Sequence, residues 1–367
     1  MSDNQRNLAL DVFRGMTVCF MIIVNNPGSW RFIYAPLEHA PWHGFTPTDL
    51  VFPSFLFAVG NAMAFVMHKY EAQGDGVFWR KTLKRTFLIF FIGYLLSWFP
   101  FVHETAGGWQ FRPVSETRIL GVLQRIALCY FFASIILHYG SKKVAVVFSM
   151  LALLVYWVVM YVWGDPNDPY SMIGNAGSKL DLILGEKHLY HGEGIAFEPE
   201  GILSTLPSIV NVIGGYLAGD FIRRRGNTYE TISKLLLVGA LLILVALTWN
   251  MVFPINKKLW TSSFVLLTVG IDLIILPALI YGIDHGKRRR WTNFFVVFGK
   301  NPLFIYILAD VLAVLFSMTP FGTWLFRDFY GALFSPINAS VLYALTFMMI
   351  CWGIGYVLDR RRIYVKV

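Results

Sequence analysis

The sequence predicts an all-α, polytopic membrane helix bundle of about ten transmembrane helices. Of its 367 residues, 56% are hydrophobic and only 14% are charged, and the mean hydropathy is +0.56. These values exclude an ordinary soluble domain of this size. Apolar runs of about 20 residues recur from Leu8 to Leu358, each long enough as a helix to cross a hydrocarbon layer of about 30 Å. Because lipid offers no water to backbone groups, these runs must be helical.

The basic residues orient the spans. In order along the chain, the predicted spans are 8–26, 49–68, 83–101, 118–138, 144–163, 201–222, 235–253, 260–283, 293–316 and 337–358. With the N-terminus inside, most lysines and arginines fall in the linkers 69–82, 139–143, 223–234 and 284–292 and in the tail 359–367. This is the positive-inside pattern, so both termini are predicted to be cytoplasmic. Topology accounts for most of the net charge of +9, and no nucleic-acid partner is expected.

The whole chain, residues 1–367, is predicted to form a single transmembrane domain with polar outer loops at about 27–48 and 164–200. The first span holds charged residues and lacks a small-residue cleavage site, which favours a retained span over a signal peptide. The cysteines lie inside apolar runs without metal-ligand spacing, so we expect buried, reduced packing residues. They are Cys19, Cys129 and Cys351.

Charged residues inside the predicted spans are the first candidates for a function, because a membrane tolerates them only when they are paired or face a wet cavity. They are Asp11, Arg14, Arg125, Asp272 and Asp310. Asp11 and Arg14 are three residues apart and share a helix face. They form either a structural ion pair or part of a polar cavity wall. For the other three, the alternatives are an interhelical hydrogen bond and the lining of that cavity, which Lys300 in "FGKNPLF" could also face.

Two histidines stand in the first outer loop, within "HAPWHGFTPTDLVFP". Pro41 and Gly44 argue against a helix that would carry both rings to one metal, so no metal site is expected. Asp49 begins the second span, and a carboxylate there can orient an imidazole as a general base near neutral pH. The residues alone leave His39 and His43 as alternatives for that base.

The ends of the first two spans hold further polar groups. Asn25 closes the first span on the outer side, and an asparagine can donate a hydrogen bond to a developing oxyanion. Thr46 or Thr48 can cap the second span, with Pro47 near its first turn.

Three cytoplasmic runs of basic residues allow two interpretations. The runs are "RRR" at 223–225, "KRRR" at 287–290 and "RRR" at 360–362. They are topology anchors, or one of them holds the phosphates of a cytosolic donor that bears a nucleotide. No glycine-rich phosphate loop follows a strand, so an ATPase is not indicated.

Five motifs, in order, carry a resemblance to a known family. They are "LDVFRGMTVCFMIIVNNPGSW", "HAPWHGFTPTDLVFPSFLFAVG", "RILGVLQRIALCYF", "FEPEGILSTLPSIVNVIGGYLAG" and "PINKKLWTSSFVLLTVG". With them the chain resembles the heparan-α-glucosaminide N-acetyltransferase family, in particular its bacterial members, from about residue 8 to the C-terminus. The resemblance implies a transmembrane acetyltransferase that takes acetyl from cytoplasmic acetyl-CoA, as a co-substrate, and delivers it to an amino sugar on the far side.

The resemblance also implies a location and partners. The lysosomal relatives carry an extra lumenal N-terminal region and an additional span, which this sequence lacks. We therefore expect a bacterial inner (plasma) membrane protein among lipids, a hexosamine acceptor such as glucosamine or a fragment ending in one, and a homodimer.

The same resemblance assigns residues. The family's "H-A-x-W-x-G" stretch matches this sequence from His39 to Gly44, which prefers His39 to His43 as the catalytic histidine, and the family's catalytic asparagine matches Asn25. We therefore expect catalytic roles for His39 and Asn25, and the residues themselves add Asp49, whose carboxylate can orient the imidazole. From the charges within and beside the spans, the groups expected along the passage of the donor are Asp11, Arg14, Arg125 and Lys300. Groups expected to contact the acceptor are Trp42, Glu198 and Glu200.

Two other functions remain open on the sequence. An inner-membrane transporter would use the same cavity and charges to carry an amino sugar or a proton inward. An O-acetyltransferase of envelope glycans would share the acyl chemistry but differ in its acceptor.

Overall fold

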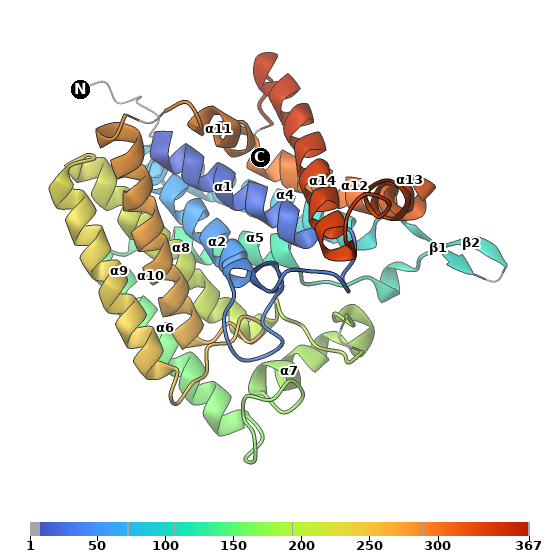
Figure 1. The fold of residues 1–367 in the computed structure, drawn as a ribbon. Helices are drawn as coiled ribbons and strands as arrows, with labels where there is room; N and C mark the ends of the chain where they lie inside the picture. Colours follow the sequence, from blue (N-terminus) through green and yellow to red (C-terminus); the bar gives the residue numbers. More distant parts are fainter. Residues whose placement is uncertain (1–7, 72, 106, 193, 288, 366–367) are drawn as a thin grey trace. The chain divides into compact units, whose positions relative to one another are not determined.

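The computed structural model describes residues 8–71, 73–105, 107–192, 194–287 and 289–365 (Figure 1). The chain separates into two compact units that interleave in sequence. The first unit comprises the described residues of Met1–Ala40, Phe45–Phe55 and Ile275–Lys366, and the second comprises Pro41–Gly44 and Leu56–Ile274. Helices α2 and α10 each contribute residues to both units.

Helices make up nearly all of the regular structure. They are α1 (Leu8–Asn25), α2 (Val51–Met63), α3 (Met67–Glu71), α4 (Asp75–Trp98), α5 (Val122–Tyr139), α6 (Lys142–Trp163), α7 (Ala176–Asp181), α8 (Ile202–Arg225), α9 (Tyr229–Trp249), α10 (Ser262–Ile280), α11 (Thr292–Lys300), α12 (Pro302–Met318), α13 (Pro320–Thr323) and α14 (Pro336–Arg360). Short 3₁₀ turns occur at Ala35–Leu37, Pro47–Leu50, Val114–Glu116, Leu182–Leu184 and Glu186–His188, and π-helical turns at Tyr281–His285 and Trp324–Tyr330.

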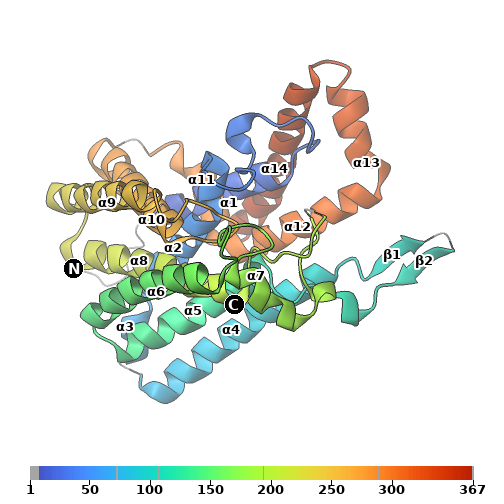
Figure 2. The same cartoon turned by 90° about the horizontal axis from the view of Figure 1, so that it is seen from below.

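The all-α prediction is confirmed, with one small addition. Strands β1 (Val102–Thr105) and β2 (Gly108–Phe111) form an antiparallel hairpin after α4, with Val102 opposite Phe111 and His103 opposite Gln110 (Figure 2). From the sequence, this segment was expected to be the outer connection between the predicted spans 83–101 and 118–138.

Seven described helices are long and apolar enough to cross a membrane. They are α1, α5, α6, α8, α9, α10 with its π-helical continuation, and α14. The count of ten therefore remains a prediction. The predicted span 49–68 corresponds to α2, which has only 13 residues. The predicted span 83–101 falls in α4, which has 24 residues but carries Arg80, Lys81, Lys84 and Arg85 in its first half.

The predicted span 293–316 corresponds to two helices, α11 and α12, which meet at a bend of 85°. Asn301 between them is not helical, with φ −129° and ψ 50°, and Pro302 cannot donate the backbone hydrogen bond that would continue α11. The Asn301 side chain donates to Ile363 O at 2.9 Å and accepts from Val365 N at 2.9 Å, which ties the bend to the segment after α14. Counted together, the bent pair would be an eighth span.

Within the first unit, α1 packs on α11 through two glycines. A Cβ atom added to Gly15 would lie 1.9 Å from Phe295 O, and one added to Gly299 would lie 2.3 Å from Asp11 O. Only glycine permits backbones to approach so closely, as at helix crossings in membranes. Helix α1 also contacts α12 and α14.

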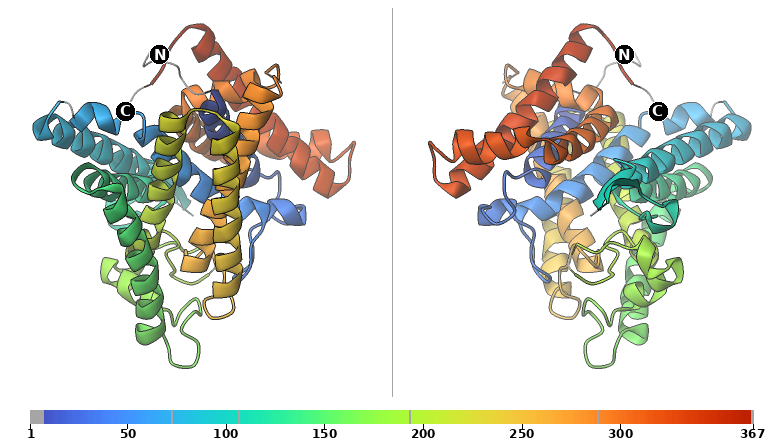
Figure 3. Two further views of the ribbon diagram at one scale, coloured as in Figure 1. Left: turned by 90° about the vertical axis from the view of Figure 1, so that its left-hand side faces the viewer. Right: turned by 90° about the vertical axis from the view of Figure 1, so that its right-hand side faces the viewer.

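Within the second unit, α8 is the central helix and contacts α5, α6, α7 and α9. Helix α4 lies beside α5 (Figure 2), and α8 returns as α9 after the short connection that begins at Gly226 (Figure 3). The part of α2 in this unit meets α8 at Gly60 and Gly215, where added Cβ atoms would lie 1.9 Å from Val212 O and 2.0 Å from Phe57 O.

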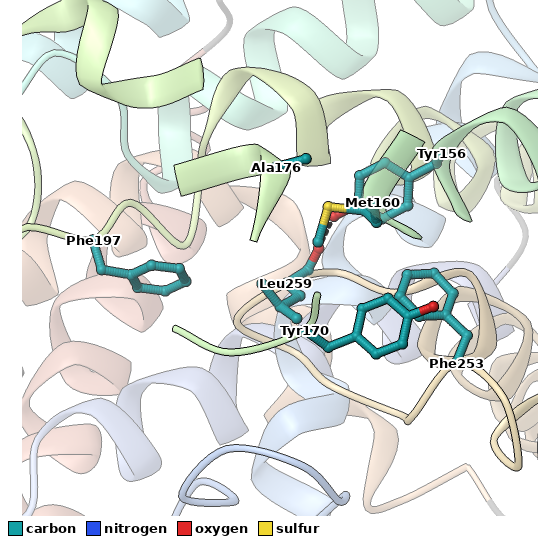
Figure 4. Close-up of a cluster of buried hydrophobic side chains, with 7 residues drawn as sticks. All are labelled: Tyr156, Met160, Tyr170, Ala176, Phe197, Phe253 and Leu259. Atoms are coloured by element: carbon teal, nitrogen blue, oxygen red, sulfur yellow. Dashed lines mark hydrogen bonds between the residues drawn. The ribbon is translucent and has the colours of Figure 1, made fainter. Parts of the chain in front are cut away.

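A cluster of buried apolar side chains holds the loops of the second unit together. Its members come from α6, α7 and the segments 164–200 and 250–261: Tyr156, Met160, Tyr170, Ala176, Phe197, Phe253 and Leu259 (Figure 4). The ring of Tyr170 lies 4.9 Å from that of Phe253, and the Tyr156 hydroxyl donates to Leu259 O. This cluster, called the loop cluster below, forms the apolar surface against which Trp42 packs.

Candidate active site

The structure brings His39 and Asp49 together in the first unit. Asp49 Oδ1 lies 2.7 Å from His39 Nδ1, the Asp49 side chain is 1% exposed and the His39 side chain is 35% exposed. A carboxylate oxygen only accepts, so Nδ1 carries the hydrogen of the neutral ring. The basic lone pair then lies on Nε2, as in a histidine oriented by a carboxylate to act as a general base.

The sequence builds this pair by capping a helical turn. Thr46 is the N-cap of the turn Pro47–Leu50 and forms a capping box with Asp49. Asp49 Oδ2 accepts from Thr46 N at 3.0 Å and from Ala40 N at 3.2 Å. Of the two predicted caps, Thr46 and Thr48, the structure has Thr46 in this position. Because Oδ2 is held by backbone donors, Oδ1 is fixed for the histidine.

The rest of this loop is held by side chains of the same unit. Thr46 Oγ1 donates to Glu38 O at 2.7 Å, and Thr48 Oγ1 donates to Pro36 O at 3.1 Å. Tyr34 OH donates to Asn338 Oδ1 at 2.6 Å at the start of α14. These bonds on both sides of His39 limit the movement of its backbone.

Asn25, the predicted oxyanion donor, is the last residue of α1 and is exposed. Its neighbour Asn26 instead donates to Ile22 O at 2.8 Å and so caps the helix end. The structure therefore distinguishes the two asparagines: Asn26 caps the end of α1, and Asn25 is exposed in its last turn.

Three residues predicted along the donor passage meet at the α1–α11 crossing of the first unit. Arg14 pairs with Asp11 Oδ1 at 2.7 Å and donates through Nε to Gly299 O at 2.9 Å. Lys300 follows directly and pairs with both Asp359 oxygens, at 2.7 and 2.8 Å. The ion pair between Asp11 and Arg14 is one of the two alternatives left open by the sequence. The donor-binding role of these residues remains a prediction.

Arg125 lies in the second unit and is 1% exposed. Its terminal nitrogens donate to neutral oxygens around the start of α8: Ser208 Oγ at 3.0 Å, Gly201 O at 3.0 Å, Pro199 O at 3.2 Å and Ser204 Oγ. Its guanidinium lies 5.2 Å from the centre of the Trp260 ring. Its Nε–H is buried and has no partner among the described residues. A buried donor of this kind suits a ligand oxygen.

Glu198 and Glu200 share one arginine, Arg118, which was not among the predicted site residues. Arg118 donates to both oxygens of Glu198, at 2.9 Å from Nε to Oε2, and to Glu200 Oε2 at 2.5 Å. Burial raises the pKa of Glu198 to about 7 against the opposing effect of Arg118. Burial also acts to raise the pKa of Glu200, but Arg118, Arg125 and Lys257 lower it below its usual value.

Because both carboxylates bond Arg118, fewer of their oxygen lone pairs are available to a ligand. The Glu198 side chain is 0% exposed and that of Glu200 is 11% exposed. Their geometry favours a structural link between the start of α5 and the start of α8. One sequence feature could have indicated this link: Arg118 is a basic residue on the outer side, which the positive-inside rule does not explain.

Trp42 and His43 belong to the second unit. Trp42 packs on the loop cluster, meets Phe197 edge-on at 5.5 Å and donates through Nε1 to Tyr170 O at 3.0 Å. His43 is exposed, with Nδ1 3.3 Å from Asn256 Nδ2. Burial lowers the pKa of His43, partly offset by the charge of Asp168. Asn256 was not among the predicted site residues, although it lies within the family-like motif "PINKKLWTSSFVLLTVG".

The fold and the site define a class: a multi-pass helical membrane protein with a carboxylate-oriented histidine beside the start of a helix. A sequence model described as heparan-α-glucosaminide N-acetyltransferase, catalytic, matches residues 6–235. The chain belongs to this family.

Two curated relatives agree with this assignment. The chain is 28% identical over 421 residues to the heparan-α-glucosaminide N-acetyltransferase of Homo sapiens, covering 98% of this chain and 59% of the relative. It is 26% identical over 428 residues to that of Mus musculus, covering 100% and 61%. The chain thus spans about three fifths of the length of these relatives.

Proposed function

We propose that this protein is a membrane-bound acetyltransferase that transfers acetyl from cytoplasmic acetyl-CoA to the amine of an amino sugar on the other side of a bacterial inner membrane. The acceptor is glucosamine or a terminal glucosaminide, and His39 is the general base. One observation carries the proposal: the 2.7 Å contact between Asp49 Oδ1 and His39 Nδ1, which places the basic lone pair on Nε2. The names of the two relatives support the acyl group and the class of acceptor.

The acceptor reacts as the neutral amine, after its ammonium form has released a proton to solvent. A base is required because the amine nitrogen becomes positively charged once it bonds to the carbonyl carbon, and it must then lose one proton. In the proposed step, the amine nitrogen forms a bond to the thioester carbonyl carbon while His39 Nε2 accepts a proton from that nitrogen. The carbon–sulfur bond then breaks, CoA leaves as a thiolate, and the imidazolium returns its proton to the sulfur. Direct transfer needs no acetyl-histidine, since one base accounts for every proton.

Asn25, the exposed last residue of α1, is proposed to donate a hydrogen bond to the developing oxyanion. A side-chain amide in this role contributes about 2.7–4 kcal/mol in other acyl-transfer enzymes. Asp11, Arg14, Arg125 and Lys300 are proposed to line the passage of the donor. The unsatisfied Nε–H of Arg125 supports this, because the amide carbonyls of a pantetheine arm are acceptors of the right kind.

On the acceptor side, Trp42 is proposed to contact the sugar, since an aromatic face suits the apolar face of a pyranose. Through their ion pairs with Arg118, Glu198 and Glu200 are proposed to hold the acceptor side of the site in position. Membrane lipids and a second copy of the chain complete the proposed partners.

The test is an assay of purified protein in detergent with labelled acetyl-CoA and glucosamine. We expect an amide product that resists mild base, and a loss of kcat of about 10²–10⁴-fold in His39→Ala. His103→Ala, an exposed histidine of β1, serves as the matched control and should keep wild-type activity. A base-labile ester would indicate an O-acetyltransferase instead. In a separate measurement, glucosamine uptake into proteoliposomes without acetyl-CoA would indicate a transporter.

A further inference from the structure

His43 is a second imidazole in the same outer loop, and the mechanism above does not use it. We infer that His43 binds the amino-sugar acceptor as a neutral hydrogen-bond donor through Nε2–H, and that it determines acceptor affinity rather than proton removal. The inference rests on the proposed function for the identity of the ligand. The position of the hydrogen on the His43 ring is inferred from the contacts of Asn256.

The amide of Asn256 has one orientation. Asn256 is 0% exposed, and its Oδ1 accepts from Leu259 N at 2.9 Å. A backbone N–H only donates, so the atom facing it must be the amide oxygen. The other end of the amide, Nδ2, therefore faces His43 and donates to Nδ1 at 3.3 Å.

This donor fixes the tautomer of His43. Nδ1 must provide a lone pair to Asn256, so the hydrogen of the neutral ring is on Nε2. His39 is in the opposite state, because Asp49 accepts from its Nδ1. One loop thus holds a histidine with a basic Nε2 and another whose Nε2 is a donor. The two rings cannot exchange roles while these partners stay in place.

The surroundings of His43 suit a sugar hydroxyl or ring oxygen as the ligand atom. The ring is exposed, and its Nε2 has no hydrogen-bond partner among the described residues. The ring of Trp42 lies 6.0 Å away and is tilted by 59°. An aromatic face beside a neutral donor is a common arrangement where a protein binds a carbohydrate through both faces and hydroxyls.

The backbone around His43 is anchored, so the donor is preorganised. Gly44 N donates to Ile255 O at 2.8 Å, and Lys258 Nζ donates to Pro41 O at 2.9 Å. The charge of Asp168 acts on the ring, and Lys258 bonds the backbone two residues before it. The segment 41–44 and the segment 255–259 are therefore one local structure. A change at Asn256 acts on the ring without requiring the loop to move.

Asn256→Asp is the sharpest test, because Oδ1 still accepts from Leu259 N while the group facing His43 becomes an acceptor. Histidine labelled with ¹⁵N reports the tautomer directly, with His43→Gln used to assign the signal. We expect wild-type His43 at pH 8 to be neutral with the hydrogen on Nε2, and Asn256→Asp to carry a hydrogen on Nδ1. A wild-type spectrum with a protonated Nδ1 would overturn the inference, whether or not the protein is an acetyltransferase.

Kinetics test the role of this donor. His43→Phe removes it and should raise KM for glucosamine roughly tenfold, the effect of one neutral hydrogen bond, with kcat changed by less than about threefold. His43→Gln keeps a donor near Nε2 and should recover part of the affinity. Unchanged KM, or a loss of kcat comparable to that of His39→Ala, would contradict the inference. Absence of acetyl transfer in the wild type would contradict the proposed function alone.

Asn256→Asp also predicts a change with pH. Its His43 would be a cation at low pH and would donate from Nε2, but on losing a proton it would keep the hydrogen on Nδ1. The ratio of the variant's KM for glucosamine to that of the wild type should therefore rise with pH. Using the ratio removes the titration of the glucosamine amine itself. A ratio independent of pH, with the spectrum changed as expected, would show that Nε2 does not contact the acceptor.

Discussion

At the scale of single residues, the proposed chemistry depends on which ring nitrogen carries a hydrogen. Asp49 is held by Thr46 and Ala40 through one oxygen and aims the other at His39. Buried carboxylates in this position do not take the proton; they orient the imidazole and stabilise its cation. The neighbouring His43, held by an amide nitrogen, has the opposite tautomer. The hydrogen-bond partner of each histidine therefore determines which of its ring nitrogens carries the hydrogen.

Asp49→Asn tests this orientation. Its amide oxygen can still accept from Thr46 N and Ala40 N, but its NH₂ group then faces His39 Nδ1 and requires the lone pair there. The base at Nε2 is lost, so kcat should fall by about 10²–10⁴-fold with little change in thermal stability. Asp328→Asn, a change of an exposed carboxylate, should keep wild-type kcat. Activity within about threefold of wild type in Asp49→Asn would mean that His39 is not oriented by this contact.

Glu198 predicts a pH dependence of stability. Its pKa is raised from 4.5 to about 7 in the folded state, so the folded state binds more protons than the unfolded state between these values. The contribution of this group is then most favourable below pH 4.5 and is lost as pH rises towards 7. The free energy of unfolding should fall by about 1–3 kcal/mol across this window, and Glu198→Gln should abolish that part of the slope.

Unfolding in mixed micelles between pH 4.5 and 8 measures this effect as the difference between wild type and variant. Glu116→Gln, which changes an exposed carboxylate, is the control and should leave the slope unchanged. A constant difference between wild type and Glu198→Gln over the whole range would show that Glu198 remains ionised beside Arg118.

At the scale of helices, close crossings set the positions of the charged side chains. Gly15 and Gly299 allow α1 and α11 to touch through their backbones, and this contact brings Arg14 Nε to Gly299 O. A sequence pattern cannot identify these glycines as crossing points, because the partner helix is distant in sequence. The bend of 85° lies within the motif "FGKNPLF", and Asn301 at the bend bonds the segment after α14, a contact that the sequence does not reveal.

Gly15→Ala should therefore destabilise the protein, although alanine favours a helix. The added Cβ would lie 1.9 Å from Phe295 O, so α1 and α11 must separate, with an expected loss of about 1–3 kcal/mol. Gly353→Ala in α14 is the matched control, since a Cβ there meets nothing within 4 Å. It should be neutral or stabilising by up to about 1 kcal/mol. Equal thermal midpoints for both variants would contradict the packing.

At the scale of the whole molecule, composition and periodicity were sufficient for the class of fold. Long apolar runs predict membrane helices because lipid leaves a backbone no alternative, and seven such helices are present in the described chain. Two features lay beyond the sequence. Helix α2 ends at Met63 and α3 begins at Met67, whereas hydropathy predicted one span over 49–68. Helices α2 and α10 are each shared between two compact units.

Only part of the candidate site could be predicted from the sequence, because some of its contacts are local and others join distant segments. Asp49 and His39 are ten residues apart, and local capping brings them together. Asn256 lies more than 200 residues from His43, and Arg118 is about 80 residues from its glutamates. Only tertiary packing creates those contacts, so single-sequence reasoning could not pair them.

The most direct test of the central claim is vectorial acetyl transfer in sealed proteoliposomes. Labelled acetyl-CoA is supplied on the cytoplasmic face of the protein, and glucosamine is confined to the opposite side. We predict labelled N-acetylglucosamine only in the compartment that holds glucosamine, at a rate abolished by His39→Ala and by Asp49→Asn. Product formed only when both substrates share one compartment, or formed equally well by His39→Ala, would contradict the account.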